Sequence, residues 1–245
     1  MIKNKNCVYC GKEVRKSKNN DDGRSVEHLI PQIAVSKKRT NAQGDFYVCR
    51  KCNTEKSKID ELLGLLSRIN TTGDGGREAI SKLAKMVGKK NKAVLSMMDC
   101  ATKHPDGMEI KLLFKGEDIY KYGLFLTKGE YFKKHGEILN NDDKIVLVTW
   151  GGPHLIKELL SSYRETYGTN PFEDLTQNDH VENIFEECFI IVGKNGTEFS
   201  FIFNQSYILI TKVVDHTEEN KTEKRINKLA LIAGFSKSEK SKYCV

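Results

Sequence analysis

The chain has 245 residues, 38% hydrophobic and 30% charged, with a formal net charge of +7. No apolar run approaches the ~18 residues of a membrane-spanning helix, and no secretory signal is visible, so we expect a cytoplasmic protein. A chain of this length is expected to form two domains.

The positive charge is concentrated at the start of the chain. Residues 1–60 contain 14 basic and 7 acidic residues, whereas the remainder contains 26 of each. Two basic clusters stand out: the first contains Lys16 and Lys18, and the second consists of Lys37, Lys38 and Arg39. Such clusters are typical of proteins that bind the phosphate backbone of nucleic acid, although a solvated surface would produce the same pattern.

Two C-x-x-C pairs predict a metal site near the N-terminus. They are Cys7 with Cys10 and Cys49 with Cys52. Each pair presents two sulfurs from one tight turn, and four thiolates match the tetrahedral coordination that structural Zn²⁺ prefers. Disulfides are the less favoured interpretation, because the total of seven cysteines is odd and the other three are scattered. We therefore expect one structural Zn²⁺ in this segment.

Four polar residues inside or beside the cysteine pairs suggest a chemistry. Glu27 and His28 lie between the pairs, Asn53 directly follows the second pair, and Lys56 comes one helical turn later. Phosphodiester hydrolysis needs a base, and a neutral His suits that role because its pKa lies near working pH. Carboxylate and amide oxygens are ligands of hard cations such as Mg²⁺ or Mn²⁺, which can polarise a phosphate.

Over residues 5–60 the sequence resembles the HNH, or ββα-metal, endonucleases of the zinc-stapled kind. The shared pattern is carried by Cys7, Cys10, Glu27, His28, Pro31, Cys49, Cys52, Asn53 and Lys56. The resemblance implies that His28 is the general base, that Glu27 and Asn53 bind a catalytic Mg²⁺ or Mn²⁺, and that Lys56 meets a phosphate. It also implies cleavage of nucleic acid, with double-stranded DNA as the favoured substrate, to leave 5′-phosphate and 3′-hydroxyl ends. Restriction, anti-phage defence, mobile-element transfer and recombination are all settings in which such an enzyme would work.

The chain departs from the family pattern at two positions. Family members more often have Asp where Glu27 stands, and the additional methylene of Glu would shift a bound metal or let the carboxylate reach another partner. The central Asn of the family, which orients the His from the loop before the second cysteine pair, is not evident. Asn41 is the nearest asparagine in that region, and Asp45 is its rival for the role.

A non-catalytic zinc ribbon that binds nucleic acid or a protein partner is the alternative hypothesis. Under this hypothesis Glu27 and His28 are surface residues, Asn53 is a helix N-cap, and Lys56 is a solvated lysine. The discriminating observation is whether the Glu27 carboxylate, the His28 imidazole and the Asn53 amide converge on one open spot.

Further elements are predicted along the rest of the chain. Helices are expected at 57–69, which continues the nuclease module, and at 77–98, with a break at 71–76 between them. Strands are expected at 110–114, 122–126, 145–149, 188–192, 198–203 and 207–213, with hairpin turns at 194–196 and 204–206. Two more helices are expected at 155–167 and 221–233.

These elements indicate an α+β fold in three parts. Residues 1–70 are expected to form a zinc-stabilised ββα-metal nuclease module, 71–108 a helical linker, and 109–245 an α+β domain with a largely antiparallel sheet. The last domain would direct the nuclease through targeting, oligomerisation as a homodimer, or regulation. The sequence as a whole therefore predicts a metal-dependent endonuclease.

Overall fold

The structure is a computed structural model that describes residues 1–17, 20–69, 71, 74–91, 94–95, 99, 102–105, 107–109, 116–140, 144–168 and 181–215. The strand predicted at 110–114, the helix predicted at 221–233 and the basic residue Lys18 lie outside the described residues. None of the described helices is both long enough and apolar enough to cross a membrane.

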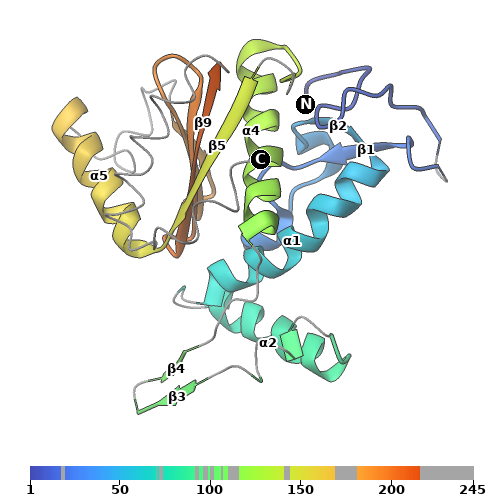
Figure 1. Cartoon of the computed structure of the whole chain (residues 1–245). Helices are drawn as coiled ribbons and strands as arrows, with labels where there is room; N and C mark the ends of the chain where they lie inside the picture. The colour runs from blue at the N-terminus through green and yellow to red at the C-terminus, as the bar shows by residue number, and fades with distance from the viewer. Residues whose placement is uncertain are drawn as a thin grey trace.

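The N-terminal part contains a short hairpin (Figure 1). Strands β1 (Arg24–Glu27) and β2 (Phe46–Cys49) pair antiparallel. The connection between them contains two short 3-10 helices, η1 (Gln32–Ala34) and η2 (Asn41–Gln43). His28 lies at the start of this connection, directly after β1.

Two helices follow the hairpin. Helix α1 (Arg50–Ile69) begins directly after β2, so the helix predicted at 57–69 is its second half. Helix α2 (Asp74–Gly88) begins inside the predicted break and ends ten residues before the predicted end at residue 98. A small hairpin of β3 (Thr102–His104) and β4 (Gly107–Glu109) comes next.

Five strands form the main sheet in the order β5-β9-β8-β7-β6, and every neighbouring pair is antiparallel. The strands are β5 (Lys144–Gly151), β6 (Val181–Ile184), β7 (Cys188–Val192), β8 (Glu198–Phe203) and β9 (Tyr207–Asp215). The sequence predicts all of them except β6, and the expected mixture of helices and antiparallel sheet is confirmed.

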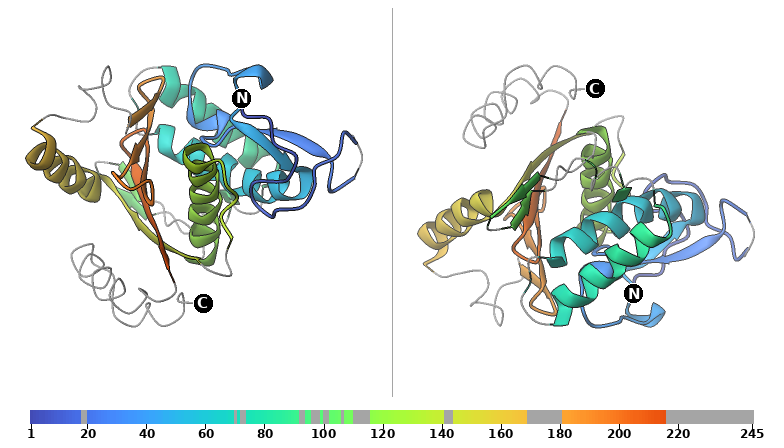
Figure 2. Two further views of the ribbon diagram at one scale, coloured as in Figure 1. Left: turned by 90° about the horizontal axis from the view of Figure 1, so that it is seen from above. Right: turned by 90° about the horizontal axis from the view of Figure 1, so that it is seen from below.

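Helices α4 (Gly116–His135) and α5 (Pro153–Tyr167) lie on opposite faces of this sheet (Figures 1 and 2). Helix α5 corresponds to the helix predicted at 155–167. The hairpin and α1 lie on the other side of α4, as the view from above in Figure 2 shows. Helix α4 is therefore the middle layer between the N-terminal part and the sheet.

The strand predicted at 122–126 is wrong, because these residues lie in the middle of α4. Tyr122 and Leu126 are fully buried, and Phe125 packs on Tyr9 of the N-terminal part with ring centroids 4.8 Å apart. A helix that is covered on several sides carries apolar residues around most of its circumference. Its short apolar run then shows no helical period and resembles a buried strand.

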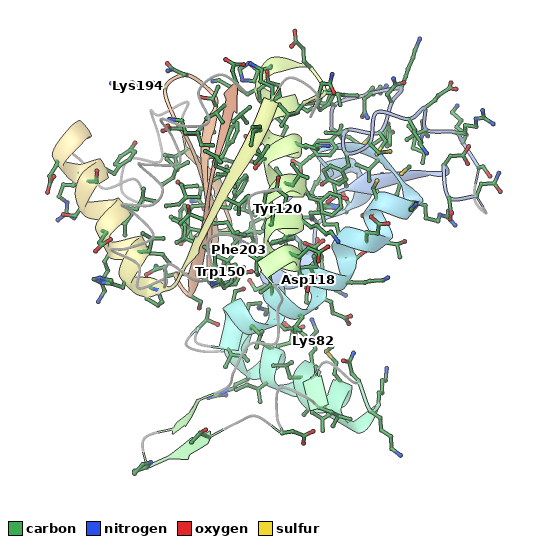
Figure 3. The ribbon with its side chains drawn as sticks, viewed as in Figure 1. Lys82, Asp118, Tyr120, Trp150, Lys194 and Phe203 are labelled. Atoms are coloured by element: carbon green, nitrogen blue, oxygen red, sulfur yellow. The ribbon has the colours of Figure 1, made fainter. Side chains whose placement is uncertain are left out.

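One hydrophobic core passes from the N-terminal part through α4 into the sheet. It contains Leu29 and Phe46 from the first part and Phe203 from the sheet. At one end of the sheet, Trp150 and Phe203, both labelled in Figure 3, stack on the ring of Tyr207. The apolar contacts thus join residues 1–70 to residues 109–245, two of the three parts predicted from the sequence, whose status as separate domains stays a prediction.

Helix α4 approaches the N-terminal part closely at Gly129. A Cβ atom there would lie 2.4 Å from Cδ1 of Leu29 and 2.9 Å from Cζ of Phe46. Both side chains are buried in the core, which leaves them little space to move. The absence of a side chain at Gly129 therefore lets α4 contact the residue that follows His28.

We expect Gly129→Ala to destabilise the protein by about 1–3 kcal/mol, because the added methyl group overpacks this contact. Gly88→Ala, at the last residue of α2, is the matched control. No atom lies within 4 Å of a Cβ at Gly88, so this variant should be neutral or slightly more stable. Urea denaturation measures both variants, and equal stabilities would contradict the close approach of α4.

Candidate metal centre and active site

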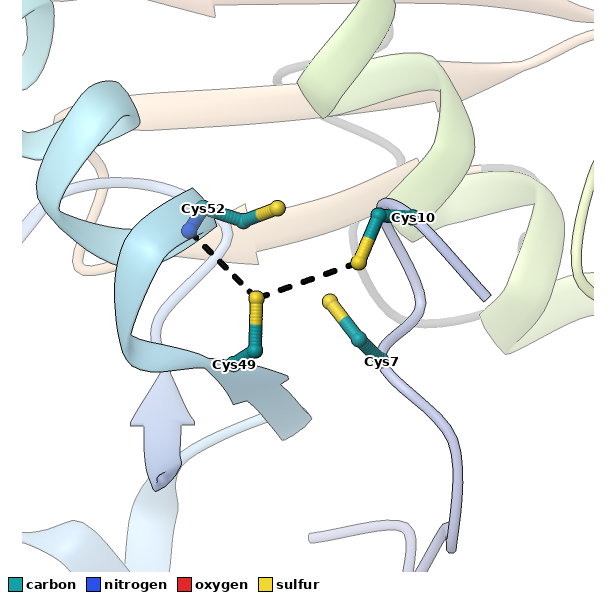
Figure 4. A group of neighbouring side chains, drawn as sticks. All are labelled: Cys7, Cys10, Cys49 and Cys52. Carbon is teal, nitrogen blue, oxygen red and sulfur yellow. Dashed lines mark hydrogen bonds between the residues drawn. The ribbon is translucent and has the colours of Figure 1, made fainter. Parts of the chain in front are cut away.

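The four cysteines of the two C-x-x-C pairs meet at one point (Figure 4). Their sulfur atoms all lie within 4.8 Å of one another, and the Sγ atoms of Cys10 and Cys49 are 3.8 Å apart. Four sulfurs around a zinc ion with Zn–S bonds of ~2.3 Å would be separated by roughly 3.8 Å. The spacing confirms that these cysteines could hold a metal ion such as zinc.

The backbone around each pair supports this geometry. The first pair is followed by Gly11, whose φ of +73° favours glycine and whose N–H donates to the carbonyl oxygen of Cys7 at 2.8 Å. In the second pair, the N–H of Cys52 points at Sγ of Cys49 at 3.5 Å. A hydrogen bond from Cys52 lowers the pKa of Cys7, which favours its thiolate form. Thiolate is the form that binds metal ions.

Glu27 and Lys56 form a buried ion pair between β1 and α1. The Nζ atom of Lys56 lies 2.9 Å from Oε1 of Glu27 and 2.9 Å from Oδ2 of Asp60, one turn further along α1. Glu27 is 2% exposed and Lys56 is 0% exposed. Burial raises the pKa of Glu27 to about 7, although the Lys56 ammonium opposes that shift. Burial alone would lower the pKa of Lys56, but Asp60 and Glu27 raise it above its ordinary value.

This ion pair contradicts the phosphate contact predicted for Lys56, because a fully buried ammonium cannot reach a nucleic-acid backbone. It also leaves Glu27 poorly suited to bind a catalytic cation, since the Lys56 ammonium already lies beside the carboxylate and repels a second cation. Side chains alternate in direction along an extended chain, so Glu27 points toward α1 and into the ion pair, whereas His28 points away from α1.

Asn53 contacts the same strand from the first turn of α1. Its Nδ2 donates a hydrogen bond to Oγ of Ser25 at 2.8 Å. Ser25 and Glu27 lie two residues apart on β1, while Asn53 and Lys56 lie three apart on α1, so both contacts belong to one strand–helix seam. The bond to Ser25 uses the amide nitrogen of Asn53 and leaves the amide oxygen as the atom that could bind a cation.

His28 is half-buried at the end of β1 and contacts the loop rather than α1. Its Nε2 lies 3.2 Å from the carbonyl oxygen of Thr40, the residue before η2. Burial lowers the pKa of His28 below its ordinary value, and the nearby guanidinium of Arg39 lowers it further. The imidazole is therefore neutral at neutral pH, which is the form that a general base requires.

Asp45, rather than Asn41, contacts the backbone beside His28. Its Oδ2 accepts the backbone N–H of Leu29 at 2.7 Å, which fixes the residue directly after His28. Its Oδ1 lies 3.8 Å from Nζ of Lys133 on α4. Asn41 is exposed at the start of η2. The structure thus favours Asp45 for the orienting role that the sequence left open between the two.

The basic residues predicted to meet phosphate differ in exposure. Lys16, Lys37 and Lys38 are exposed, and their side chains can reach a ligand in solvent. Arg39 is half-buried, and its guanidinium donates to the carbonyl oxygen of Ile30. Arg39 therefore braces the loop after His28 and contributes positive charge beside the imidazole.

The structure does not bring Glu27, His28 and Asn53 to one open spot. The Glu27 and Asn53 side chains contact the seam between β1 and α1, whereas His28 contacts Thr40. Among the described residues, the cysteine cluster is the one group of Cys, His, Asp or Glu side chains with metal-binding spacing. A catalytic cation would therefore depend on fewer protein ligands than the resemblance implies.

Sequence reasoning missed two charged residues that shape this region. Asp60 shares the ammonium of Lys56 with Glu27, and its position four residues after Lys56 on a helix is a signal that could have revealed the contact. Lys133 contacts Asp45 and also pairs with Glu130 on α4 at 3.2 Å. No local signal connects Lys133 to the His28 region, because the contact depends on how α4 packs.

No protein-family model, curated protein or solved structure matches this chain.

We expect purified protein to contain one zinc ion per chain, bound by the four clustered cysteines. Cys49→Ser should lose the ion and unfold the N-terminal part, because metal binding and folding share one free energy in such sites. Cys188→Ala is the control, since Cys188 is a buried thiol of β7 outside the cluster. Elemental analysis after dialysis measures the zinc, and folded wild-type protein without zinc would overturn the assignment.

Lys56→Met should destabilise the protein by about 3–5 kcal/mol, because it leaves buried carboxylates without a counter-charge. Lys58→Met, which changes an exposed lysine of the same helix, should stay within about 0.5 kcal/mol of the wild type. Thermal and urea denaturation of the two variants provide the comparison. An equally mild effect at both positions would show that Lys56 is not buried against Glu27 in solution.

Proposed function

We propose that this protein is an endonuclease that hydrolyses phosphodiester bonds in nucleic acid, with His28 as the general base. The observation that carries the proposal is the placement of His28, which is half-buried and hydrogen-bonded to Thr40, with a pKa lowered by burial and by the Arg39 guanidinium. A general base must be unprotonated and must be held in one orientation relative to the nucleophile. His28 meets both conditions, and Asp45 adds a second constraint by fixing Leu29.

The surroundings of His28 support the same proposal. A strand pair leads directly into a helix, the four-cysteine cluster lies at their junction, and the motif residues occupy these elements in the order that the resemblance implies. All of the net positive charge falls within residues 1–60, the segment that contains His28. Such a charge distribution attracts a polyanion and favours nucleic acid as the substrate, with double-stranded DNA as our working choice.

The residues take distinct parts in this proposal. His28 would accept the proton of the attacking water. The four cysteines would hold a structural Zn²⁺ that fixes the junction of β2 and α1. A catalytic Mg²⁺ or Mn²⁺ would neutralise the phosphate with water and phosphate oxygens as most of its ligands, because Asn53 contacts the seam between β1 and α1 and His28 faces away from it. Glu27 would serve as the buried partner of Lys56 instead of a metal ligand.

A zinc-stabilised nucleic-acid-binding module without catalytic activity is the second candidate. The buried pair of Glu27 and Lys56 favours it, because a binding module has no need of a carboxylate beside the His28 imidazole. Under this hypothesis the basic segment binds phosphates and His28 has a structural role.

The test is cleavage of supercoiled plasmid DNA, and of an RNA of similar length, with and without Mg²⁺ or Mn²⁺. We expect metal-dependent cleavage by the wild type and a loss of about 10²–10⁴-fold in rate for His28→Ala, with zinc content and DNA binding retained. His154→Ala is the matched control, because His154 is an exposed histidine on α5 that pairs with Glu158. Binding without any cleavage by the wild type would favour the non-catalytic module.

Glu27→Gln separates the two interpretations of Glu27. If Glu27 were a metal ligand, the substitution would remove that ligand, so cleavage would fall by orders of magnitude and would not recover with added Mn²⁺. The structure instead places this carboxylate in an ion pair, so we expect reduced stability with cleavage largely retained at temperatures where the variant is folded. Abolished cleavage in a stable Glu27→Gln protein would restore the metal-ligand interpretation.

A further inference from the structure

Two hairpin turns at one end of the main sheet have an unusual backbone. Phe185 and Glu186, between β6 and β7, have φ values of +58° and +62°, and Asn204 and Gln205, between β8 and β9, have +49° and +52°. Tight hairpins of this kind normally contain glycine, because side chains other than glycine are strained at positive φ. Backbone strain of this kind persists only where surrounding contacts enforce it.

Both turns contact the loop of residues 29–40 that follows His28. Glu187 Oε2 accepts the backbone N–H of Ser36 at 2.6 Å, and Nδ2 of Asn204 donates to the carbonyl oxygen of Ala34 at 2.9 Å. The turns are joined to each other, since the N–H of Asn204 donates to the carbonyl oxygen of Glu187 at 2.7 Å. They therefore act on the loop as one unit.

A second set of contacts ties the same turns to α1. Nδ2 of Asn204 also donates to Oγ of Ser67 at 2.9 Å, and the hydroxyl of Ser206 donates to the Ser67 carbonyl oxygen at 2.7 Å. The ammonium of Lys37 lies 5.5 Å from the ring centroid of Phe185, which adds a cation–π contact to the basic part of the loop. We call the four contacting residues the turn platform: Phe185, Glu187, Asn204 and Ser206.

The loop itself transmits these contacts to His28. Gln32 braces it from within, because its Nε2 donates to the Lys37 carbonyl oxygen and its Oε1 accepts the Arg39 N–H, both at 2.8 Å. The loop ends at Thr40, whose carbonyl oxygen faces Nε2 of His28. A platform that fixes Ala34 and Ser36 therefore restricts the position of Thr40 and, through it, the imidazole.

We propose that the turn platform is a positioning device for His28, so that the C-terminal sheet completes the active site instead of acting only as a separate targeting unit. This inference rests on the proposed nuclease function. The polar contacts go to backbone groups of the loop, and the carbonyl oxygen of the buried Ala34 needs such a partner. Simple packing between two domains would require neither these directed hydrogen bonds nor strained turns without glycine.

Asn204→Gly and Gln205→Gly form a matched pair of tests. Both substitutions relieve backbone strain at a positive φ in the same turn, but only Asn204→Gly removes the donor to Ala34 and Ser67. Gln205 is exposed and serves as the control. Three readouts apply: hydrogen exchange of the loop amides, the ring resonance of His28 assigned with His28→Ala, and kcat and KM for plasmid cleavage.

For Asn204→Gly we expect hydrogen exchange across residues 33–40 to become about tenfold faster, with a shifted His28 resonance and an unchanged melting temperature. The kcat for cleavage should fall by a larger factor than KM changes, because catalysis needs His28 in one orientation, whereas the exposed Lys37 and Lys38 can reach a phosphate from a looser loop. Gln205→Gly should match the wild type in loop exchange, His28 resonance, kcat and KM. Identical behaviour of the two variants would overturn the proposal.

Glu187 provides a second pair that does not depend on the folding of Asn204→Gly. Glu187→Ala removes the acceptor for Ser36, whereas Glu187→Gln keeps an amide oxygen in its place and should restore wild-type exchange and His28 resonance. No difference between Glu187→Ala and Glu187→Gln would count against the platform. If the wild type cleaves no nucleic acid, the proposed function fails, while loop exchange and the His28 resonance still decide whether the platform positions His28.

Discussion

The four-cysteine cluster is the constraint on which the N-terminal half of the fold depends. It joins a turn at the start of the chain to the junction of β2 and α1, and Cys10 and Cys49 are 39 positions apart in sequence. β1, His28 and the loop that follows all lie inside the segment that this cluster closes. A metal ion bound there would therefore stabilise the fold and the geometry around His28 with the same free energy.

The two faces of β1 have separate tasks. Ser25 and Glu27 face α1 and form the seam with Asn53 and Lys56, whereas the next side chain, His28, faces the loop. Two carboxylates share one ammonium in this seam, and the pKa of Glu27 rises to about 7 as a result of burial. The seam therefore holds the strand against the helix, and the chemistry that we propose belongs to the opposite face.

Local sequence signals predicted the features that local geometry determines. Paired cysteines specify their own cluster, and runs rich in β-branched and aromatic residues, separated by short polar turns, predicted β7, β8 and β9. Features decided by tertiary packing were missed. The apolar run of α4 resembled a strand because the helix is covered on several sides, and Lys56 resembled a surface lysine because its partner Glu27 is distant in sequence. The rivalry between Asn41 and Asp45 likewise needed the fold, because both occupy the same loop.

Attraction and positioning are divided between the two halves of the chain. The first 60 residues carry the whole net positive charge, so they determine how strongly a polyanion is drawn to the protein. The residues after position 60 position the loop around His28. On α4, Lys133 faces Asp45, and Gly129 lets the helix touch Leu29. In the sheet turns, Asn204 and Glu187 hold the loop that ends at Thr40. A metal ion alone could close the N-terminal segment, but it would leave Leu29 without its cover and the loop without its directed partners. The continuous core and these directed contacts make the sheet part of the structure that determines where the His28 imidazole lies.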